Sequence, residues 1–299
     1  MAILVVGSVA LDTIKTPFGT ARNALGGSAT YFSLAASLSV PVNLVAVVGR
    51  DFPRRHVELL RRRPIDLTGL EVARGRTFRW SGEYHLDMNT RTTRALALNV
   101  FAAFRPKIPG IYADSPIVFL ANIDPALQLA VLRQIRRPRL VACDTMDHWI
   151  RRKRSTLIRL LRRVDVLTIN DEEARLLAQT PHLRRAGREL LRRGPSAVII
   201  KKGEHGSLLF RRGEMFAVPA YPLEDVVDPT GAGDTFAGGV LGYLARQRRL
   251  TAPALRRAML YGTALASFCV EQFGVARLTT LTRRDMRRRL QAIQSLMRC

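Results

Sequence analysis

Short apolar runs alternate along the chain with amphipathic stretches, and this alternation is the strongest constraint on how the chain can fold. The strand-like runs are Ile3–Val6, Val42–Val48, Ile117–Leu120, Leu140–Cys143, Val166–Ile169 and Ala197–Ile200. The helical stretches between them are Thr30–Leu38, Ala126–Ile135, Ser155–Arg163, Glu172–Gln179 and Ala186–Arg193. Strands that are apolar on both faces and separated by helices predict an α/β fold, with a mostly parallel sheet flanked by helices on both sides.

Polar residues follow several of these predicted strands. They are Asn122, Asp124, Asp144, Asn170, Lys201 and Lys202. Because ligands bind outside the carboxyl ends of parallel strands, we expect these side chains to share one rim of a crevice. Helix caps and turns are the alternative interpretation. For Asp124, which precedes Pro125, the cap is the preferred one.

Two segments interrupt the alternation of strand and helix. Residues 12–25 are short, polar and contain glycine, and residues 71–104 alternate on both sides of a turn at Asp87–Thr90. In the second segment every second residue is large and apolar except for a slip at Gly82, which is typical of a β-ribbon. We interpret both segments as a small β lid over the crevice. Repeats and low-complexity linkers are absent from the sequence, so residues 1–299 are predicted to form a single domain.

The chain is strongly basic, with 48 Lys and Arg against 24 Asp and Glu and a net charge of +24. Only five of the basic residues are lysine, and most arginines flank leucine-rich helical patterns, where they suit a solvated face. Helix-turn-helix, zinc-finger and aromatic RNA-binding signatures are missing, so specific nucleic-acid binding is not expected. No run is long enough for a membrane span, and three scattered cysteines fit a reducing cytoplasm.

The stretch from Asp228 to Gly239 carries the chemistry. It reads Asp-Pro-Thr-Gly-Ala-Gly-Asp-Thr-Phe-Ala-Gly-Gly and leads into an apolar helical pattern. The backbone N–H groups of Gly231, Ala232 and Gly233 are expected to converge at the start of that helix, where they would form an anion hole. Asp234 would lie beside this hole and could accept the proton of an attacking hydroxyl. A glycine-rich turn capped by Asp is the alternative.

This stretch closely resembles the second signature of the ribokinase-like (PfkB) carbohydrate kinase family, without departure from Asp228 to Leu241. The resemblance covers nearly the whole chain. It implies a ribokinase-like three-layer α/β fold and transfer of the ATP γ-phosphate to a hydroxyl of a sugar or sugar-like molecule. It also implies that Asp234 is the catalytic base and that Gly231–Gly233 form the anion hole.

Further matches follow in the family's order. Asp12 and the pair Gly26-Gly27 resemble substrate-binding segments, although a hinge turn would also explain the glycines. Asn170 and Glu173 match the family's Asn-x-x-Glu, which organises Mg²⁺ through water and phosphates; a helix cap is the alternative. Lys201 resembles a phosphate contact, with a surface lysine as the alternative.

The resemblance assigns further residues to ATP and Mg²⁺, more loosely for the last two. They are Gly203, Asp228, Thr230, Thr263 and Gly274. It adds K⁺ as a candidate monovalent cation near Gly274, assigns no direct protein ligand to the metal, and makes a homodimer through the lid a hypothesis.

Two departures from the family pattern concern the acceptor. Tyr31 stands where the first signature usually has Asn, and Ala10 replaces the sugar-contacting Asn of ribokinases. Ribose is therefore disfavoured. A tyrosine at this place favours either a nucleoside base or simple core packing. The alternatives are a nucleoside or inositol kinase of the same fold and, more remotely, a non-catalytic relative that binds nucleic acid. P-loop, protein-kinase and Rossmann motifs are missing, and the five histidines show no metal-ligand spacing.

Overall fold

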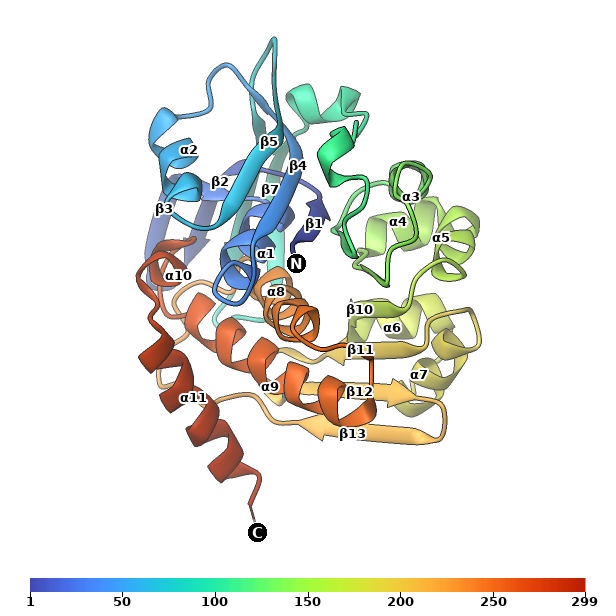
Figure 1. Ribbon diagram of the computed structural model, residues 1–299. Coiled ribbons are helices and arrows are strands. Elements are labelled where there is room, and N and C mark those ends of the chain that lie inside the picture. The colour runs from blue at the N-terminus through green and yellow to red at the C-terminus, as the bar shows by residue number, and fades with distance from the viewer. Residues whose placement is uncertain (299) are drawn as a thin grey trace.

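A large twisted sheet forms the centre of the computed structural model, which describes residues 1–298 (Figure 1). Within these residues its strands are β1 (Ile3–Val6), β4 (Val42–Gly49), β5 (Ile65–Ala73), β8 (Ile117–Leu120), β9 (Leu140–Cys143), β10 (Val166–Asn170), β11 (Ala197–Lys201), β12 (Ser207–Arg211) and β13 (Glu214–Val218). Their spatial order is β13-β12-β11-β10-β9-β8-β1-β4-β5. All neighbours from β5 to β11 pair in parallel, and β12 and β13 add an antiparallel edge.

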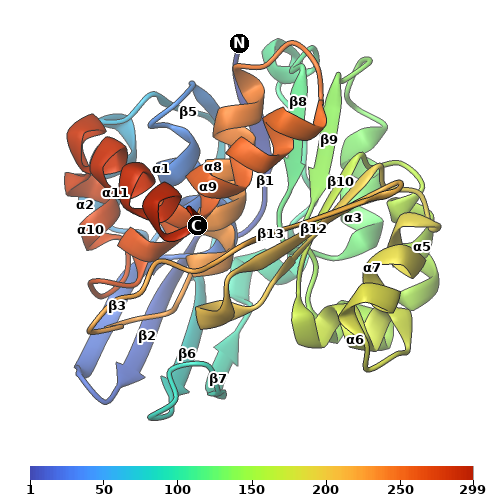
Figure 2. The ribbon, with the colours of Figure 1, turned by 90° about the horizontal axis from the view of Figure 1, so that it is seen from below.

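Both faces of the sheet are buried, as the apolar runs predict. Along β1, Ile3 and Val5 belong to one core, while Leu4 and Val6 belong to the other. The first core lies against α1 (Ser28–Ala36), α2 (Arg54–Arg61), α8 (Ala232–Ala245), α9 (Ala252–Cys269), α10 (Ala276–Thr280) and α11 (Arg283–Leu296). The second lies against α3 (Pro125–Leu132), α4 (Asp147–Arg152), α5 (Arg154–Leu161), α6 (Asp171–Ala178) and α7 (Leu183–Leu191). Figure 2 shows the two helical layers on opposite sides of the strands, so the predicted three-layer architecture is confirmed.

A second, four-stranded sheet projects from one end of the large one. Its order is β3 (Gly19–Gly26), β2 (Ala10–Thr16), β6 (Phe78–Tyr84) and β7 (Arg91–Ala97). The predicted slip is real, because the register between β6 and β7 shifts between Ser81 and Gly82. At this slip the Trp80 indole lies where a side chain on residue 82 would have to be, so the position requires glycine.

The outer parts of the segment 71–104 do not belong to this second sheet. Glu71–Ala73 form the end of β5, which pairs in parallel with β4 in the large sheet. Asn99–Ala103 form a short 3₁₀ helix, and there Phe101 stacks on both Phe78 and Phe104. The period-2 pattern runs through β5 into β6, so it does not reveal that the chain changes sheets near residue 75.

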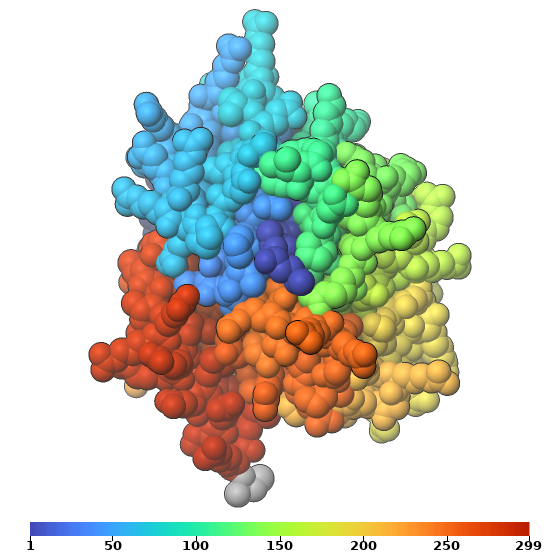
Figure 3. All heavy atoms as spheres, in the orientation of Figure 1, coloured from blue at the N-terminus to red at the C-terminus, as the bar shows by residue number. Residues whose placement is uncertain are grey.

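Local capping follows the sequence closely. Asp124 caps α3 by accepting from the Ala126 N–H at 2.9 Å, which confirms the cap interpretation, and it also pairs with Lys153. The N-terminus is connected to the body, because Arg139 contacts both the Met1 sulfur and the Gln247 carbonyl. Figure 3 shows the first residues (dark blue) bordered on this face by green atoms from the middle of the chain and by orange atoms from the region near residue 250.

Two of the three cysteines, Cys143 and Cys269, are buried free thiols, and Cys299 lies outside the described residues. Among residues 1–298, no helix has both the length and the apolar character that crossing a bilayer would require.

Candidate active site

The signature stretch builds a tight turn at the start of α8. Gly231 precedes the helix with φ 75°, a conformation that favours glycine, and the Tyr31 ring occupies the place of any side chain there. Thr235 N–H donates to the Gly231 carbonyl at 2.8 Å, which closes the first helical turn. The N–H groups of Gly233 and Asp234 donate to no other residue in the described part of the chain. These donors, at the positive end of a fourteen-residue helix, suit a phosphate anion.

Asp234 lies in the first turn of α8, partly buried beside these donors. Burial, together with the negative charge of Asp144, raises the pKa of the Asp234 carboxyl to about 7. The positive charges of Lys201 and Arg91 oppose this rise. A carboxyl whose pKa lies close to neutrality is suited to accept a proton from a hydroxyl and release it again.

The Asp228 carboxylate stabilises the turn at the start of α8. Its fully buried carboxylate accepts from the Thr230 N–H at 2.9 Å and from the Gly274 N–H at 2.7 Å. Gly274 has φ 59° and follows α9, so one side chain joins the entry of α8 to the exit of α9. Thr263 is buried on α9, and no hydrogen bond in the described chain joins its side chain to this group.

The predicted pair Asn170 and Glu173 forms a capping box at the start of α6. Asn170 Oδ1 accepts from the Glu173 N–H at 2.7 Å, and Glu173 Oε2 accepts from the Asn170 N–H at 3.1 Å. The cap interpretation is therefore confirmed, but the cap does not account for all the groups that surround the Glu173 carboxyl. Burial and the charge of Asp144 raise the pKa of Glu173 to about 7, with Lys201 opposing the rise. Glu173 is thus both a cap and one member of a cluster of acidic groups.

Lys201 is not a surface lysine. Its side chain is 16% exposed, and Nζ donates to Asp144 Oδ2 at 2.8 Å. Burial alone would lower the pKa of Lys201, but the carboxylates of Asp144 and Glu173 outweigh it and raise the pKa. A methyl group on Gly233 would lie 3.0 Å from Nζ, so the ammonium rests against the bare backbone of the anion-hole turn.

Asp144 is the residue that sequence reasoning missed at this site. Its position after a predicted strand placed it on the rim, but no role was assigned to it. In the structure its carboxylate affects the pKa of Asp234 and of Glu173, and it holds Lys201. The other rim positions differ in their surroundings. Asn122, for example, bonds to Trp149 and Met146.

Another buried carboxylate, that of Asp12, comes from the small sheet. Asp12 on β2 is 4% exposed, and its side chain lies directly over Gly26, where any side chain would overlap it. Gly27 has φ 94° and packs closely on the Ser8 backbone. Burial and the charge of Asp228 raise the pKa of Asp12 to about 7, against a hydrogen bond from the Gly27 backbone. The negative charge of Asp234 also contributes to this rise.

The β6–β7 hairpin contacts two other parts of the chain. Thr230 Oγ1 donates to the Tyr84 hydroxyl at 3.3 Å. At the tip of the hairpin, Asn89 Nδ2 donates to Glu204 Oε1 at 2.9 Å, next to Gly203 with its φ of 53°. Gly203 opens the short turn Gly203–His205, which follows β11. The hairpin thus contacts both the signature stretch and the turn that follows β11.

Tyr31 belongs to the packing beneath the site. It is 1% exposed, and its ring supports Gly231 from below. Its hydroxyl has no hydrogen-bond partner within residues 1–298. A side chain so completely covered cannot line the crevice in this conformation, which favours the packing interpretation over a contact with a nucleoside base.

Known proteins with similar sequences are kinases. Residues 115–281 match the model of the pfkB family carbohydrate kinases. A cytidine kinase from Thermococcus kodakarensis is 30% identical over 253 residues, which are 83% of this chain and 90% of that protein. A nucleoside kinase from Methanothermobacter thermautotrophicus is 26% identical over 291 residues, 91% of this chain and 90% of the other. The chain belongs to the pfkB family of carbohydrate kinases.

Solved structures show the same fold. The nucleoside kinase of Methanocaldococcus jannaschii superimposes with a TM-score of 0.77 at 22% identity, over 97% of this chain and 98% of that one. A ribokinase from Thermotoga maritima gives 0.77 at 20% identity, over 97% and 99%. The ribokinase-like fold predicted from the sequence is therefore confirmed. The protein is an ATP-dependent phosphotransferase that acts on a hydroxyl of a sugar or nucleoside. A fructokinase from Vibrio cholerae with a similar fold was solved with fructose, ADP and calcium ion bound.

Proposed function

We propose that Asp234 is the general base and that the Gly231–Gly233 turn is the anion hole for the transferring phosphoryl group. The observation that carries the proposal is the placement of Asp234 in the first helical turn, next to N–H groups that donate to no other described residue. Asp234 would take the proton of the acceptor hydroxyl as that oxygen attacks phosphorus. The N–H groups and the α8 dipole would stabilise the charge on the phosphoryl oxygens.

ATP is proposed to bind over the carboxyl ends of the strands and the C-terminal helices. The residues assigned to ATP and Mg²⁺ are Asn170, Glu173, Lys201, Gly203, Asp228, Thr230, Thr263 and Gly274. Buried carboxylates such as Glu173 offer the oxygen donors that Mg²⁺ prefers. In residues 1–298 no group of three or more His, Cys, Asp or Glu side chains could hold a metal ion. As the family resemblance implies, Glu173 and Asn170 would hold Mg²⁺ through water and phosphates, and the ion would neutralise charge on those phosphates. K⁺ is proposed for the loop at Gly274.

The acceptor is proposed to lie between Asp12, Gly26, Gly27 and the small sheet. Asp12 would accept hydrogen bonds from acceptor hydroxyls, and the bare backbone at Gly26 and Gly27 allows a close approach. Closure of the β6–β7 hairpin would exclude water and so limit ATP hydrolysis.

A nucleoside acceptor is the second candidate, favoured by the names of the relatives. The Thermococcus kodakarensis relative is a cytidine kinase, and one solved neighbour is a nucleoside kinase in complex with inosine. In this case Asp12 would hold ribose hydroxyls, and the base would extend toward the small sheet. An inositol acceptor also has a named relative, an Arabidopsis thaliana inositol 3-kinase that is 24% identical over 292 residues.

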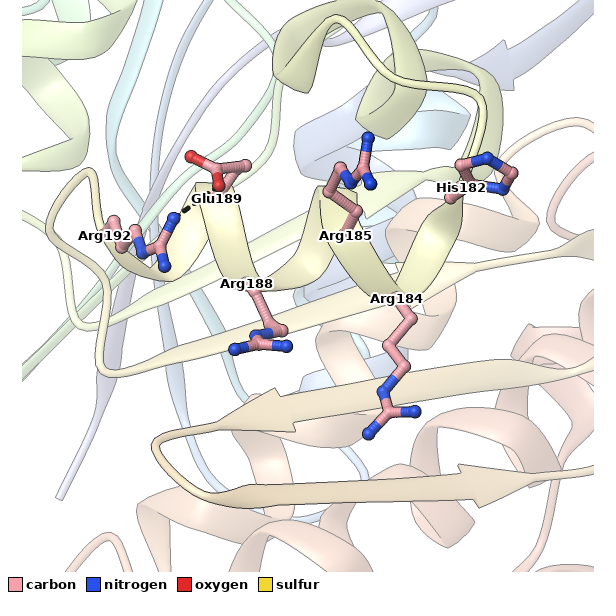
Figure 4. A pocket seen from close by; sticks show the side chains of 6 residues that line it. All are labelled: His182, Arg184, Arg185, Arg188, Glu189 and Arg192. Carbon is pink, nitrogen blue, oxygen red and sulfur yellow. Dashed lines mark hydrogen bonds and ion pairs between the residues drawn. The ribbon is translucent and has the colours of Figure 1, made fainter.

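A non-catalytic, nucleic-acid-binding role has weaker support. The arginine-lined hollow of about 500 Å³ on α7 is bordered by His182, Arg184, Arg185, Arg188, Glu189 and Arg192. Figure 4 shows that Arg185 extends in a different direction from Arg184 and Arg188, while Arg192 pairs with Glu189. These guanidinium groups do not converge on one spot, which favours a solvated helix face over an anion site.

Two further assignments complete the proposal. The small sheet is proposed to mediate a homodimer, because Leu96 on its edge strand β7 is 58% exposed. A cytoplasmic location is proposed because the buried cysteines Cys143 and Cys269 are free thiols.

The proposal is tested by ADP release from the purified protein with Mg-ATP and K⁺. The acceptors would be ribose, fructose, 2-keto-3-deoxygluconate, myo-inositol, adenosine, inosine and cytidine. We expect acceptor-dependent release that falls by several orders of magnitude in Asp234→Asn, with ATP affinity little changed. Equal turnover in this variant would contradict the role of Asp234. A wild-type protein that binds no ATP would contradict the assignment as a whole.

A further inference from the structure

Lys201 carries a buried ammonium at the anion-hole turn, and most of its donors are unused. Lys201 ends β11, and Nζ lies against Gly233 at the start of α8. An ammonium has three N–H donors. Within residues 1–298, its one hydrogen-bond acceptor is Asp144 Oδ2 at 2.8 Å. A buried cation with donors to spare points to an anion that is to be bound beside it.

Asp144 is held so that it can fix the position of this ammonium. It follows β9, and its side chain is 6% exposed. Its second carboxylate oxygen, Oδ1, accepts from the Thr145 N–H at 2.8 Å, and its backbone carbonyl accepts from Gln128 Nε2 at 3.1 Å. Both carboxylate oxygens are thus engaged, so the carboxylate has little freedom to rotate.

The ion pair bridges two strands that are not neighbours. β10 lies between β9 and β11, and Asn170 at its end stands in register with Lys201. The pair therefore passes over the end of β10, beside the Asn170–Glu173 capping box and facing α8. The ends of β9, β10 and β11 therefore meet the start of α8 at this point. Each of these four elements contributes a residue to the candidate site or lies next to one.

We propose that Asp144 is a positioning residue for phosphoryl transfer, which holds the Lys201 ammonium against Gly233 beside the N–H groups of the anion hole. The inference rests on the proposed function and adds Asp144 to it, as a residue that acts through Lys201. In this arrangement Lys201 would direct its remaining donors at phosphate oxygens, and Asp144 would keep it from turning toward the neighbouring carboxylates of Glu173 or Asp234.

A purely structural role explains the pair less well. A buried ion pair loses its hydration, and apolar residues of similar size often serve folding equally well or better. Lys201 and Asp144 both follow fully apolar strand segments in which such residues are already present. The Asp144–Lys201 ion pair lies against Gly233, where the Lys201 ammonium could donate hydrogen bonds to a bound phosphate. This role explains its position better.

The test compares Asp144→Asn, Lys201→Met and the double variant in the ADP-release assay. We expect each single variant to lower kcat by about 10²–10³-fold, as for the loss of one electrostatic stabiliser of a transition state. The KM for the acceptor should stay near its wild-type value. Because Asp144 acts through Lys201, the double variant should lose no more than Lys201→Met alone. Losses that multiply, or wild-type turnover in Asp144→Asn, would overturn the inference.

A binding measurement supplies a readout that does not depend on turnover. Calorimetry would compare the affinity for a non-hydrolysable ATP analogue with that for ADP. Both single variants should lose about ten-fold or more of the preference for the triphosphate, in line with loss of a hydrogen bond to a charged group. An unchanged preference in both would overturn the inference.

Asp124→Asn is the matched control. Asp124 also follows a strand and also pairs with a lysine, Lys153, at 2.7 Å, and asparagine keeps the helix cap. Its turnover should match the wild type. If Asp144→Asn unfolds, the double variant removes both charges together and provides the folded comparison. Wild-type protein that is inactive with every acceptor would overturn the proposed function and this inference with it. An active, Asp234-dependent wild type with a normal Asp144→Asn variant would overturn this inference alone.

Discussion

Asn89 at the tip of the β6–β7 hairpin donates to Glu204 at 2.9 Å, which connects the small sheet to the turn after β11. The contact is exposed and polar, so it can break and re-form readily. Asp87 holds the tip in shape by accepting from the N–H groups of Asn89 and Thr90. The proposed closure of the hairpin therefore depends on this exposed hydrogen bond together with the one between Thr230 and Tyr84.

Asn89→Ala should weaken this closure. Since an exposed hydrogen bond contributes about 0.5–1.5 kcal/mol, we expect kcat/KM for the acceptor to fall roughly 2- to 10-fold. ATP hydrolysis without acceptor should rise relative to transfer, because water enters more often. Steady-state kinetics with and without acceptor measures both. Arg94→Ala is the control, since it removes the hairpin's own ion pair with Glu83 and leaves Glu204 untouched. An equal effect in both variants would contradict a specific role for Asn89.

Gly231→Ala should destabilise the protein and abolish transfer. A methyl group there would overlap the Tyr31 ring, and φ 75° is itself unfavourable for alanine. Gly213→Ala is a matched control, because Gly213 has φ 73° but no atom within 4 Å of an added methyl group. Strain alone costs on the order of 1 kcal/mol, and the overlap should add on the order of 2 kcal/mol more. Chemical denaturation of both variants gives the difference, and similar losses would show that the Tyr31 contact is unimportant.

The pH dependences of stability and of turnover should run in opposite directions. The pKa of Asp234 rises on folding from 3.8 to about 7, so folding favours its protonated form. This stabilisation is complete below about pH 4 and is lost as the pH rises through about 7. A base must be deprotonated, so kcat/KM should rise over the upper part of the same interval.

Asp234→Asn separates the two effects. Because asparagine carries no charge, the variant should be more stable than the wild type near pH 8, on the order of 2 kcal/mol, while its transfer activity is lost. Asp12 and Glu173, whose pKa values are also about 7, should preserve part of the pH slope in this variant. Thermal melting across the pH range measures this. A wild-type kcat/KM that does not change with pH would contradict the assignment of Asp234.

Leu96→Lys should weaken the proposed homodimer. Leu96 is 58% exposed on the edge strand β7, and a lysine on an edge strand opposes pairing with another chain. Light scattering should show a dimer for the wild type and a monomer for the variant, with the melting temperature little changed. A monomeric wild type would refute the dimer.

The sequence predicted six of the nine strands of the large sheet within residues 1–298, because these six are buried on both faces and therefore appear as apolar runs. Strands β5, β12 and β13, near the edges of the sheet, were not predicted, since each is only partly buried. The sequence was less informative about the site, where one residue can have both a structural and a functional role. Asn170 and Glu173 fit a helix cap in sequence and form one, yet only the structure shows that Asp144 and Lys201 lie beside them. The Asp144–Lys201 pair joins residues 57 apart in sequence, so no local pattern could reveal it. The boundary between β5 and β6 was not predicted either, because a period of two does not indicate which sheet a strand joins.

The close fit of the Asp12 carboxylate over the bare backbone of Gly26 limits how this enzyme could change during evolution or design. A new acceptor preference cannot be introduced by placing a side chain at residue 26, because that position would displace Asp12 before it touched any ligand. Diversification must instead occur at positions whose side chains have room to vary, such as those along β6 and β7. The small sheet would then be the adaptable part of the molecule, while the contact between Asp12 and Gly26 limits change at residue 26.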